Sequence, residues 1–332
     1  MNLSSIGEFG FIKRFSGKFD DLLGPGSTGI GDDCAVIPVE GDGELVVSTD
    51  MLVEDVHFLR DKISPYDLGY KSLAVNLSDI AAMGGSPVAS FLSLAIPPDL
   101  DLEYMDCLLD GYHDLSRRFA VPLMGGDTTR SGEKLIISVT ILGKVAKGRA
   151  RLRSGAQTGD IVAVTGKLGD SAAGLHILLN SLGCEGVNEQ LVAKHTKPEP
   201  CVKEGSWLAT QDGVNCMMDV SDGIASDIGH ILNRSGKGAV IDLNGLPFSD
   251  ELRTFCSDRQ LDPYYFATSG GEDYCLLLTI SKDLFDSVAK AYSREFSTCL
   301  YPIGQITDGS ELTWKKDGKV LAKGPGKGFS HF

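Results

Sequence analysis

Aspartates at the ends of apolar segments are the residues in this sequence with the clearest chemical potential. Each one follows or adjoins an apolar run or a glycine-rich turn. The set comprises Asp33, Asp50, Asp79, Asp127, Asp219 and Asp222. Taken singly, each is more typical of a helix cap or a turn than of a ligand. If several converged without a cation, each close pair would cost about 4 kcal/mol, so the set indicates a cation site.

Magnesium suits these aspartates, because it binds carboxylate and hydroxyl oxygens and leaves positions for phosphate groups. Ser48 and Thr49 beside Asp50 add two hydroxyls. The run "GSTGIGDDCAVIP" at 26–38 places glycines directly before Asp33. Backbone amides in such a loop can approach phosphate. We therefore expect aspartates that hold magnesium ions, which in turn make phosphate binding favourable.

The familiar nucleotide-binding loops are absent from the sequence. There is no G-x-x-x-x-G-K-[ST], no G-x-G-x-x-G between a strand and a helix, and no kinase glycine-rich loop with H-R-D and D-F-G. The run "SGKGAV" at 235–240 has Gly-Lys without a following Ser or Thr. If the protein uses ATP, it binds ATP through another fold.

The hydrophobic pattern predicts a mixed α/β (α+β) chain of two domains. Strands are expected at 44–50, 89–96, 134–145, 160–166, 214–220, 238–243 and 274–280, and helices at 65–84, 103–119, 170–180, 221–236 and 282–292. The polar segment "RLRSGAQTGD" at 151–160 suggests a boundary. We expect one domain over 1–150 and a second over 151–332.

The helix expected at 65–84 illustrates how one aspartate is positioned. Leu73, Leu77 and Ile80 form an apolar stripe, and Asp79 projects from another face in the last turn. A carboxylate near a helix C-terminus is disfavoured by the helix dipole. A solvated aspartate is the simpler interpretation of Asp79 alone, but this position favours a ligand.

Composition excludes several classes of partner. The net charge is −14 and the isoelectric point is about 4.8, which argues against nucleic acid and anionic membranes. No apolar run reaches the length of about 18 residues typical of a membrane span, and the N-terminus does not resemble a signal peptide. The eight cysteines include no C-x-x-C pair. We expect reduced thiols, no zinc site and a cytoplasmic location.

Several segments together resemble the thiamine-monophosphate kinase family, within the aminoimidazole-ribonucleotide synthetase-like superfamily. They run almost from end to end: "GEFGFI", "GIGDDCAV", "STDMLVEDVHF", "KSLAVNLSDIAAMGGSP", "GGDTTRS", "GRARLRSGAQTGD", "VTGKLGDSAAGL", "DVSDGIASDIGHI", "LPFSD", "SGGEDY" and "GFSHF". The resemblance implies conversion of thiamine monophosphate to thiamine diphosphate with ATP and several magnesium ions. It also implies a homodimer in which the N-terminal domains share a β-barrel.

The resemblance assigns roles to individual positions. Magnesium ligands would be Asp33, Ser48, Thr49, Asp50, Asp79, Asp127, Asp219 and Asp222. ATP would meet Gly126, Asp127, Arg153 and Ser221. The reacting phosphates would be held by Asp79, Asp127, Asp219 and Arg153 as the catalytic set. Thiamine monophosphate would contact His57, Glu272 and position 326.

Simpler interpretations exist for several of these residues. Taken alone, His57 suits a satisfied surface histidine, Glu272 a turn carboxylate and Arg153 a solvated cation. Ser221 and Asp222 also suit helix N-caps. Their neighbours Asp32 and His230 are interpreted as structural.

One position departs from the family pattern. Some relatives carry an aromatic residue where this chain has Gly326, six positions before the C-terminal Phe. Phe329 or Trp314 are possible substitutes in packing against the thiamine rings. The phosphate-binding positions show no such departure.

The expected reaction is a direct in-line transfer of the ATP γ-phosphoryl group. The nucleophile is a phosphate oxygen that is already ionised, so neither a general base nor a covalent enzyme intermediate is required. One alternative is another ATP-using enzyme of the superfamily. However, the first cysteine, Cys34, lies inside the glycine loop, unlike in selenophosphate synthetases, and the chain lacks the C-terminal cysteine of the hydrogenase-maturation protein. A second alternative is a non-catalytic module that binds nucleotide or thiamine phosphate.

Overall fold

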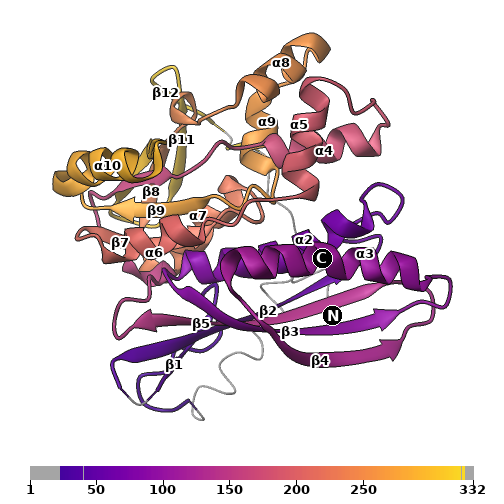
Figure 1. Ribbon diagram of the computed structural model, residues 1–332. Helices are drawn as coiled ribbons and strands as arrows, with labels where there is room; N and C mark the ends of the chain where they lie inside the picture. The colour runs from indigo at the N-terminus through magenta and orange to yellow at the C-terminus, as the bar shows by residue number, and fades with distance from the viewer. Residues whose placement is uncertain (1–22, 40, 323, 326–332) are drawn as a thin grey trace, which may run out of the picture.

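Two β-sheets, one from each half of the chain, organise the molecule (Figure 1). The computed structural model describes residues 23–39, 41–322 and 324–325. The first sheet has the order β1-β2-β5-β3-β4, with β3 and β4 parallel and the other neighbours antiparallel. Its strands are β1 (Ala35–Pro38), β2 (Gly43–Val53), β3 (Ser86–Ile96), β4 (Leu123–Arg130) and β5 (Ile136–Ala146).

Two helices cover one face of this sheet: α2 (Pro65–Ala82) and α3 (Leu102–Phe119). Alternate strand residues such as Ile137, Val139 and Ile141 of β5 point toward them and are buried, as the two-residue period of a strand requires. Glycine permits the close approach of the helices, since a Cβ on Gly69 would lie 1.8 Å from the Leu108 carbonyl oxygen.

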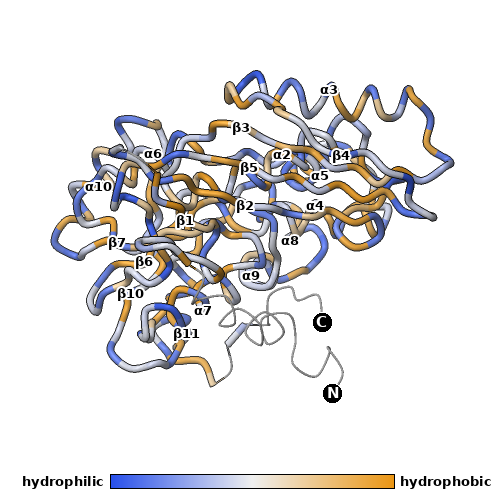
Figure 2. Tube along the Cα trace, turned by 90° about the horizontal axis from the view of Figure 1, so that it is seen from below, coloured by the Kyte–Doolittle hydropathy of each residue, from blue (hydrophilic) through white to orange (hydrophobic). Residues whose placement is uncertain are grey.

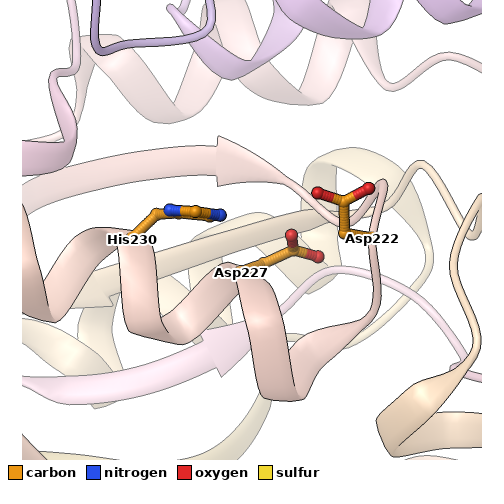
Figure 3. A group of neighbouring side chains, drawn as sticks. All are labelled: Asp222, Asp227 and His230. Carbon is orange, nitrogen blue, oxygen red and sulfur yellow. The ribbon is translucent and has the colours of Figure 1, made fainter. Parts of the chain in front are cut away.

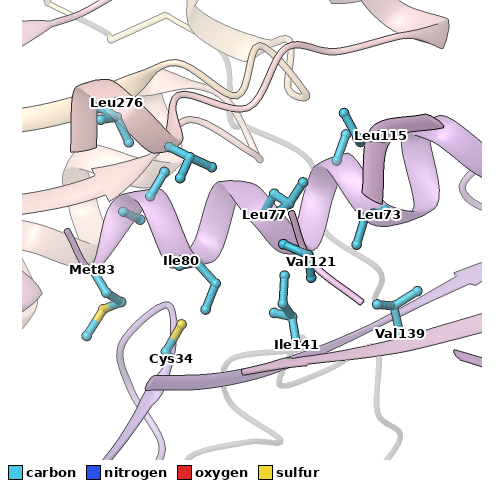
Figure 4. Close-up of a cluster of buried hydrophobic side chains, with 14 of the residues drawn as sticks. Cys34, Leu73, Leu77, Ile80, Met83, Leu115, Val121, Val139, Ile141 and Leu276 are labelled. Carbon is cyan, nitrogen blue, oxygen red and sulfur yellow. The ribbon is translucent and has the colours of Figure 1, made fainter. Parts of the chain in front are cut away.

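Helix α2 is buried on both sides because it lies between the two halves. Leu73, Leu77 and Ile80 share one core cluster with Ile141 of the first sheet and with Leu276 of the second (Figure 4). The polar face that the sequence places opposite the apolar stripe is therefore buried against the second half. This explains how α2 brings polar side chains into the interior.

The second half surrounds a seven-stranded sheet of order β12-β11-β8-β10-β6-β9-β7, in which β11 and β8 are parallel. Its strands are β6 (Ile161–Val164), β7 (Val214–Asp219), β8 (Gly238–Asp242), β9 (Leu276–Ile280), β10 (Tyr301–Thr307), β11 (Leu312–Lys316) and β12 (Lys319–Val320). The helices are α4 (Asp170–Leu179), α5 (Val187–Thr196), α6 (Val202–Thr210), α7 (Ile224–Ser235), α8 (Asp250–Arg259), α9 (Pro263–Ser269) and α10 (Lys282–Phe296). Single 3-10 turns lie at Arg153–Gly155 and Leu243–Gly245.

The face of the first sheet that points away from α2 and α3 is exposed. Figure 2 looks at the molecule from this side. Large apolar side chains are exposed on its strands, including Met51 (56%), Phe91 (40%) and Met124 (63%). The expected mixed two-domain α/β fold is confirmed, whereas the shared barrel between two copies stays a prediction.

The described part of the chain contains no helix with the length and apolarity needed to cross a bilayer. All eight cysteines are free thiols.

Candidate active site

A cavity of about 1040 Å³ opens between the two halves. Its wall includes Asp50, His57 and Asp79 from the first half and Ser171, Asp222 and Glu272 from the second. The first group comes from β2, the loop after it and α2, and the second from α4 and from loops that follow β7 and α9. The cavity therefore brings together residues from motifs in both halves of the chain.

Three of the predicted metal ligands converge beside this cavity. Oxygen atoms of Asp33, Asp79 and Asp219 lie within 4.8 Å of one another. Asp33 lies two residues before the first residue of β1, Asp79 is in the last turn of α2, and Asp219 ends β7. Three segments distant in sequence thus deliver carboxylates to one point, which fits a hard cation with oxygen ligands.

Burial and mutual repulsion determine the electrostatics of this group of carboxylates. Burial, followed by repulsion from neighbouring carboxylates, raises the pKa of Asp79 and of Asp219 well above its usual range. The same two causes raise the pKa of Asp50 to about 6. Two serines partly offset this: Ser48 donates to Asp79, and Ser78 Oγ donates to Asp219 Oδ2 at 2.6 Å.

Arg153 is not a solvated cation but a partner of the acidic group. Its Nη2 lies 2.9 Å from Asp33 Oδ1, and its Nε lies 3.3 Å from Asp33 Oδ2, a two-point contact. Its backbone N–H donates to Asp32 Oδ1 at 2.6 Å. Asp32 therefore holds the backbone of the Arg153 turn, which agrees with the structural interpretation of Asp32.

A second group of potential ligands lies at the start of α7. Asp222, in the loop before this helix, has a ligand atom within 4.8 Å of atoms of Asp227 and His230. Figure 3 shows Asp227 and His230 projecting from α7 toward the same region. Gly223 is the N-cap of α7, so neither Ser221 nor Asp222 takes the N-cap position.

Within this group, sequence reasoning did not single out Asp227 and interpreted His230 as structural. Asp227 is fully buried, and neither carboxylate oxygen has a hydrogen-bond partner in the described structure, although the Asp222 backbone is near enough to lower its pKa slightly. Burial and then Asp222 outweigh this and raise the pKa of Asp227 well above its usual range. Burial and then Arg153 lower the pKa of His230 to about 4, which leaves a neutral ring. Two carboxylates and an imidazole could hold a divalent cation.

The residues predicted to contact thiamine monophosphate also line the cavity. His57 Nδ1 accepts a hydrogen bond from the backbone N–H of Val53 at 3.0 Å, so the proton of a neutral ring resides on Nε2. Glu272 lies in the loop between α9 and β9, where the buried Lys71 of α2 donates to its Oε2 at 2.9 Å. Both side chains are therefore held by hydrogen bonds within the protein, unlike a solvated surface histidine or turn carboxylate.

Some predicted ligands are not brought to the cluster. The hydroxyl of Thr49 turns to the open face of β2, where it contacts Thr140 Oγ1 at 3.0 Å, although Thr49 still borders the cavity. The reason is the two-residue period of the strand, which places Ser48 and Asp50 on the opposite face. Gly326 lies outside the described residues, as does Phe329. Trp314 is buried in the second core and does not line the cavity.

Gly126 and Asp127 are far from the cluster within one chain. Register links Asp50 of β2 through Val139 and Leu92 to Gly126 of β4. Three strand spacings separate them, which is about 14 Å. Asp127 is exposed, and its Oδ1 accepts from the backbone N–H of Thr128. Asp127 therefore does not join the carboxylate cluster of its own chain, and its metal-binding role stays a prediction.

Sequence reasoning also missed Lys71 and His195, which contact Glu272, and Asp273, which accepts a hydrogen bond from the Gly169 N–H at the start of α4. A signal for Lys71 was available, since Lys71, Val75 and Asp79 recur at a spacing of four and all line the cavity. No comparable signal marks His195.

Comparisons with known proteins agree with this geometry. Two family models, described as the N-terminal and C-terminal domains of AIR synthase related protein, match residues 31–145 and 157–315. The two-sheet fold and its intervening site thus belong to the AIR synthase-related class.

Similar proteins narrow the class further. A thiamine-monophosphate kinase of Escherichia coli K12 is 42% identical over 99% of both chains. The crystal structure of the Aquifex aeolicus thiamine monophosphate kinase has a TM-score of 0.82 at 32% identity, covering 97% of this chain and 100% of that one. A structure described as AaThiL complexed with AMPPCP and TMP has a TM-score of 0.86 at 34% identity, covering 100% and 99%. This chain belongs to the thiamine-monophosphate kinase family.

Proposed function

We propose that this protein transfers the γ-phosphoryl group of ATP directly to the phosphate of thiamine monophosphate, forming thiamine diphosphate. The observation that carries the proposal is the convergence of Asp33, Asp79 and Asp219 beside a cavity between the halves, in a chain of this family. The relative complexed with AMPPCP, an ATP analogue, and with TMP supports the same two substrates.

The donor set fits magnesium. Burial and neighbouring carboxylates raise the pKa values of Asp79 and Asp219 well above their usual range, and a bound cation would relieve that repulsion. Asp33, Asp50, Asp79 and Asp219 would hold the ions, with the Ser48 hydroxyl beside Asp79. Asp222, with Asp227 and His230, would hold a further ion. Bound magnesium would neutralise phosphate charge and orient the reacting oxygens.

The protein's own residues account for the remaining steps. The Arg153 guanidinium can give up one of its two contacts with Asp33. It can then form paired hydrogen bonds with a nucleotide phosphate. Glu272 and His57, which both line the cavity, hold thiamine monophosphate as the acceptor. Because the acceptor phosphate is already ionised, no side chain must remove a proton, and none needs to form a phosphorylated intermediate.

A homodimer completes the proposal. The apolar face of the first sheet is exposed, and its edge strand β4 carries Gly126 and Asp127 away from the chain's own cluster. Pairing of two such faces would bury Met51 and Phe91 and would present Asp127 and Gly126 to the site of the other copy. We assign this pairing to residues 1–150 and completion of the cavity to residues 151–332.

Product formation tests the proposed function. The purified protein would be incubated with Mg-ATP and thiamine monophosphate, and the thiamine esters would be oxidised to thiochromes and separated by fluorescence chromatography. We expect thiamine diphosphate to appear, to be lost with EDTA, and not to form from free thiamine. A folded, ATP-binding protein that forms no diphosphate would instead be another enzyme of the superfamily or a binding module.

A further inference from the structure

Three polar side chains meet at a part of the cavity that the phosphate-transfer cluster does not use. Lys71 Nζ of α2 lies 2.9 Å from Glu272 Oε2, and His195 Nδ1 of α5 lies 3.1 Å from the same oxygen. Ser171 Oγ of α4 lies 3.1 Å from His195 Nδ1. Helices α2 and α5, one from each half of the chain, therefore contact one carboxylate, and α4 contacts the histidine of α5.

The two oxygens of this carboxylate have different surroundings. Both the lysine and the histidine contact Oε2. In the described part of the chain, Oε1 of Glu272 has no hydrogen-bond partner, and it is not among the buried unsatisfied atoms. The side chain is 24% exposed and lines the cavity. One oxygen is held by the protein, and the other is accessible from the cavity.

The charges of the group keep the carboxylate ionised. Burial alone would raise the pKa of Glu272, but Lys71 and then His195 outweigh it and hold the pKa well below its usual range. Burial and then Lys71 lower the pKa of His195. Because a carboxylate only accepts hydrogen bonds, we assign a proton to His195 Nδ1, which lies 3.1 Å from Oε2.

The backbone also fixes the orientation of Glu272. Its φ of +61° lies in the left-handed region, which is uncommon for a residue with a side chain. Its N–H donates to the Ser221 carbonyl at 2.8 Å, and the N–H of Tyr274 donates to the Val220 carbonyl at 2.9 Å. The neighbouring Asp273 accepts from the N–H of Gly169 at the start of α4. These contacts hold an unfavourable backbone conformation that directs the side chain toward α2.

We propose that Lys71 and His195 are positioning residues that hold Oε2 of Glu272 and present the ionised Oε1 to an N–H donor of the acceptor's heterocycle. The inference rests on the proposed function, because thiamine carries an amino-substituted pyrimidine ring that supplies such a donor. Leu175, Leu179 and Tyr265 in the same cavity wall suit the flat faces of that ring. Specificity for the acceptor thus depends on two residues that need not touch it.

A double-mutant cycle with steady-state kinetics tests the inference on the full-length enzyme. Lys71→Met and Glu272→Gln should each raise KM for thiamine monophosphate about tenfold or more, the effect of losing a charged hydrogen bond. KM for ATP should change less than about twofold, because ATP does not contact Glu272. If Lys71 acts through Glu272, Lys71→Met should add little to the effect of Glu272→Gln in the double variant.

The histidine supplies a conservative rescue. His195→Leu should raise KM for thiamine monophosphate, whereas His195→Asn, whose amide takes the place of Nδ1–H, should restore most of it. Lys237→Met is the matched control, since Lys237 pairs with Asp308 outside the cavity. Its kinetics should equal those of the wild type.

Folding is followed by thermal melting of each variant. Lys71→Met leaves a carboxylate without its buried cation, whereas the double variant leaves no unpaired charge and should be the more stable of the two. If Lys71→Met does not fold, the double variant and the His195 pair decide the question.

The opposite results are equally clear. Fully additive effects of Lys71→Met and Glu272→Gln, an equal rise in KM for ATP, or failure of His195→Asn to improve on His195→Leu would each overturn the positioning role. A wild-type enzyme that forms no thiamine diphosphate would reject the proposed function instead. The two failures are therefore distinguishable.

Discussion

Asp79 occupies the point where the carboxylates of the site are most crowded. Burial and then Asp50, Asp219 and Asp33 raise its pKa, and its described donor is Ser48. A buried carboxylate in this setting destabilises the fold unless a cation or a proton compensates it. Under the proposed function, Asp79 would lower stability in exchange for the ability to bind metal, as functional sites often do.

Asp79→Asn should separate activity from stability. We expect turnover to fall about 100- to 1000-fold, the effect of losing one strong electrostatic contact in an active site. In EDTA the variant should melt at a higher temperature than the wild type, because the substitution removes one of the mutually repelling carboxylates. The stabilisation that magnesium gives the wild type should shrink. Near-normal turnover would remove Asp79 from the metal site.

Asp50→Asn should have a pH-dependent effect on the metal-free protein. The folded pKa of Asp50 is about 6 against an ordinary value of 3.8, so the folded state binds more protons between these values. Its ionisation therefore costs stability as pH rises. The variant should gain stability over the wild type as pH rises toward 6, up to about 3 kcal/mol. Urea unfolding in EDTA measures this; a gain independent of pH would contradict it.

At the residue scale, the sequence predicts the residues of the acidic cluster better than the polar residues around it. Asp33, Asp79 and Asp219 stand at element ends beside recognisable motifs, and the structure brings them together. Lys71 and His195 lie inside helices; Lys71 shares a four-residue spacing with Val75 and Asp79, whereas nothing local distinguishes His195 from a solvated residue. Their proximity to Glu272 depends on how the two halves pack, which the sequence pattern does not contain.

Helix α2 is the element on which the site depends most. It carries Lys71 and Asp79, and it packs against both sheets and against α3. Its distance from α3 is set by Gly69 and Gly111, since a Cβ on either would lie within 2 Å of a carbonyl oxygen of the other helix. A change in this helix contact therefore displaces the residues that line the cavity.

Gly69→Ala should destabilise the protein by about 1–3 kcal/mol, the usual cost of overpacking, and should also reduce activity. Gly229→Ala in α7 is the matched control, because a Cβ there meets no atom within 4 Å. That change should stabilise the helix by about 0.5–1 kcal/mol. Denaturant unfolding gives both values. Equal effects of the two substitutions would show that the α2–α3 contact does not set the spacing.

At the element scale, strands and helices with a clear period are predicted well. The strand expected at 44–50 and the helix expected at 65–84 correspond to β2 and α2. The strand β4 is not evident in the sequence, because "LMGGDTTR" has two glycines and no alternation, and its pairing with β3 creates it. Helix α8 is also missed, since its charged sequence has few apolar positions.

At the scale of the whole molecule, the open face of the first sheet predicts a dimer. Phe91 is exposed on this face next to the edge strand. Phe91→Glu should prevent pairing by placing charges in an apolar contact. Analytical ultracentrifugation should find a dimeric wild type and a monomeric variant. A wild type that is monomeric at all concentrations tested would contradict the proposed pairing.

The same pairing predicts that two inactive variants complement each other. If Asp127 serves the partner's site, mixed dimers of Asp127→Asn and Asp79→Asn contain one intact site and one with both changes. After subunit exchange, random pairing should restore about a quarter of wild-type activity. No recovery from a mixture that exchanges subunits would place Asp127 in its own chain's site or in none.

The stereochemical course at phosphorus tests the central claim most directly. The claim is that crowded aspartates, through bound metal, bring two phosphate groups together for one in-line transfer without a phosphorylated enzyme. ATP made chiral at the γ-phosphorus with sulfur and oxygen isotopes would be used with thiamine monophosphate, and the configuration of the product would be determined. We predict inversion, the result of a single displacement. Retention would require two displacements and would contradict the account.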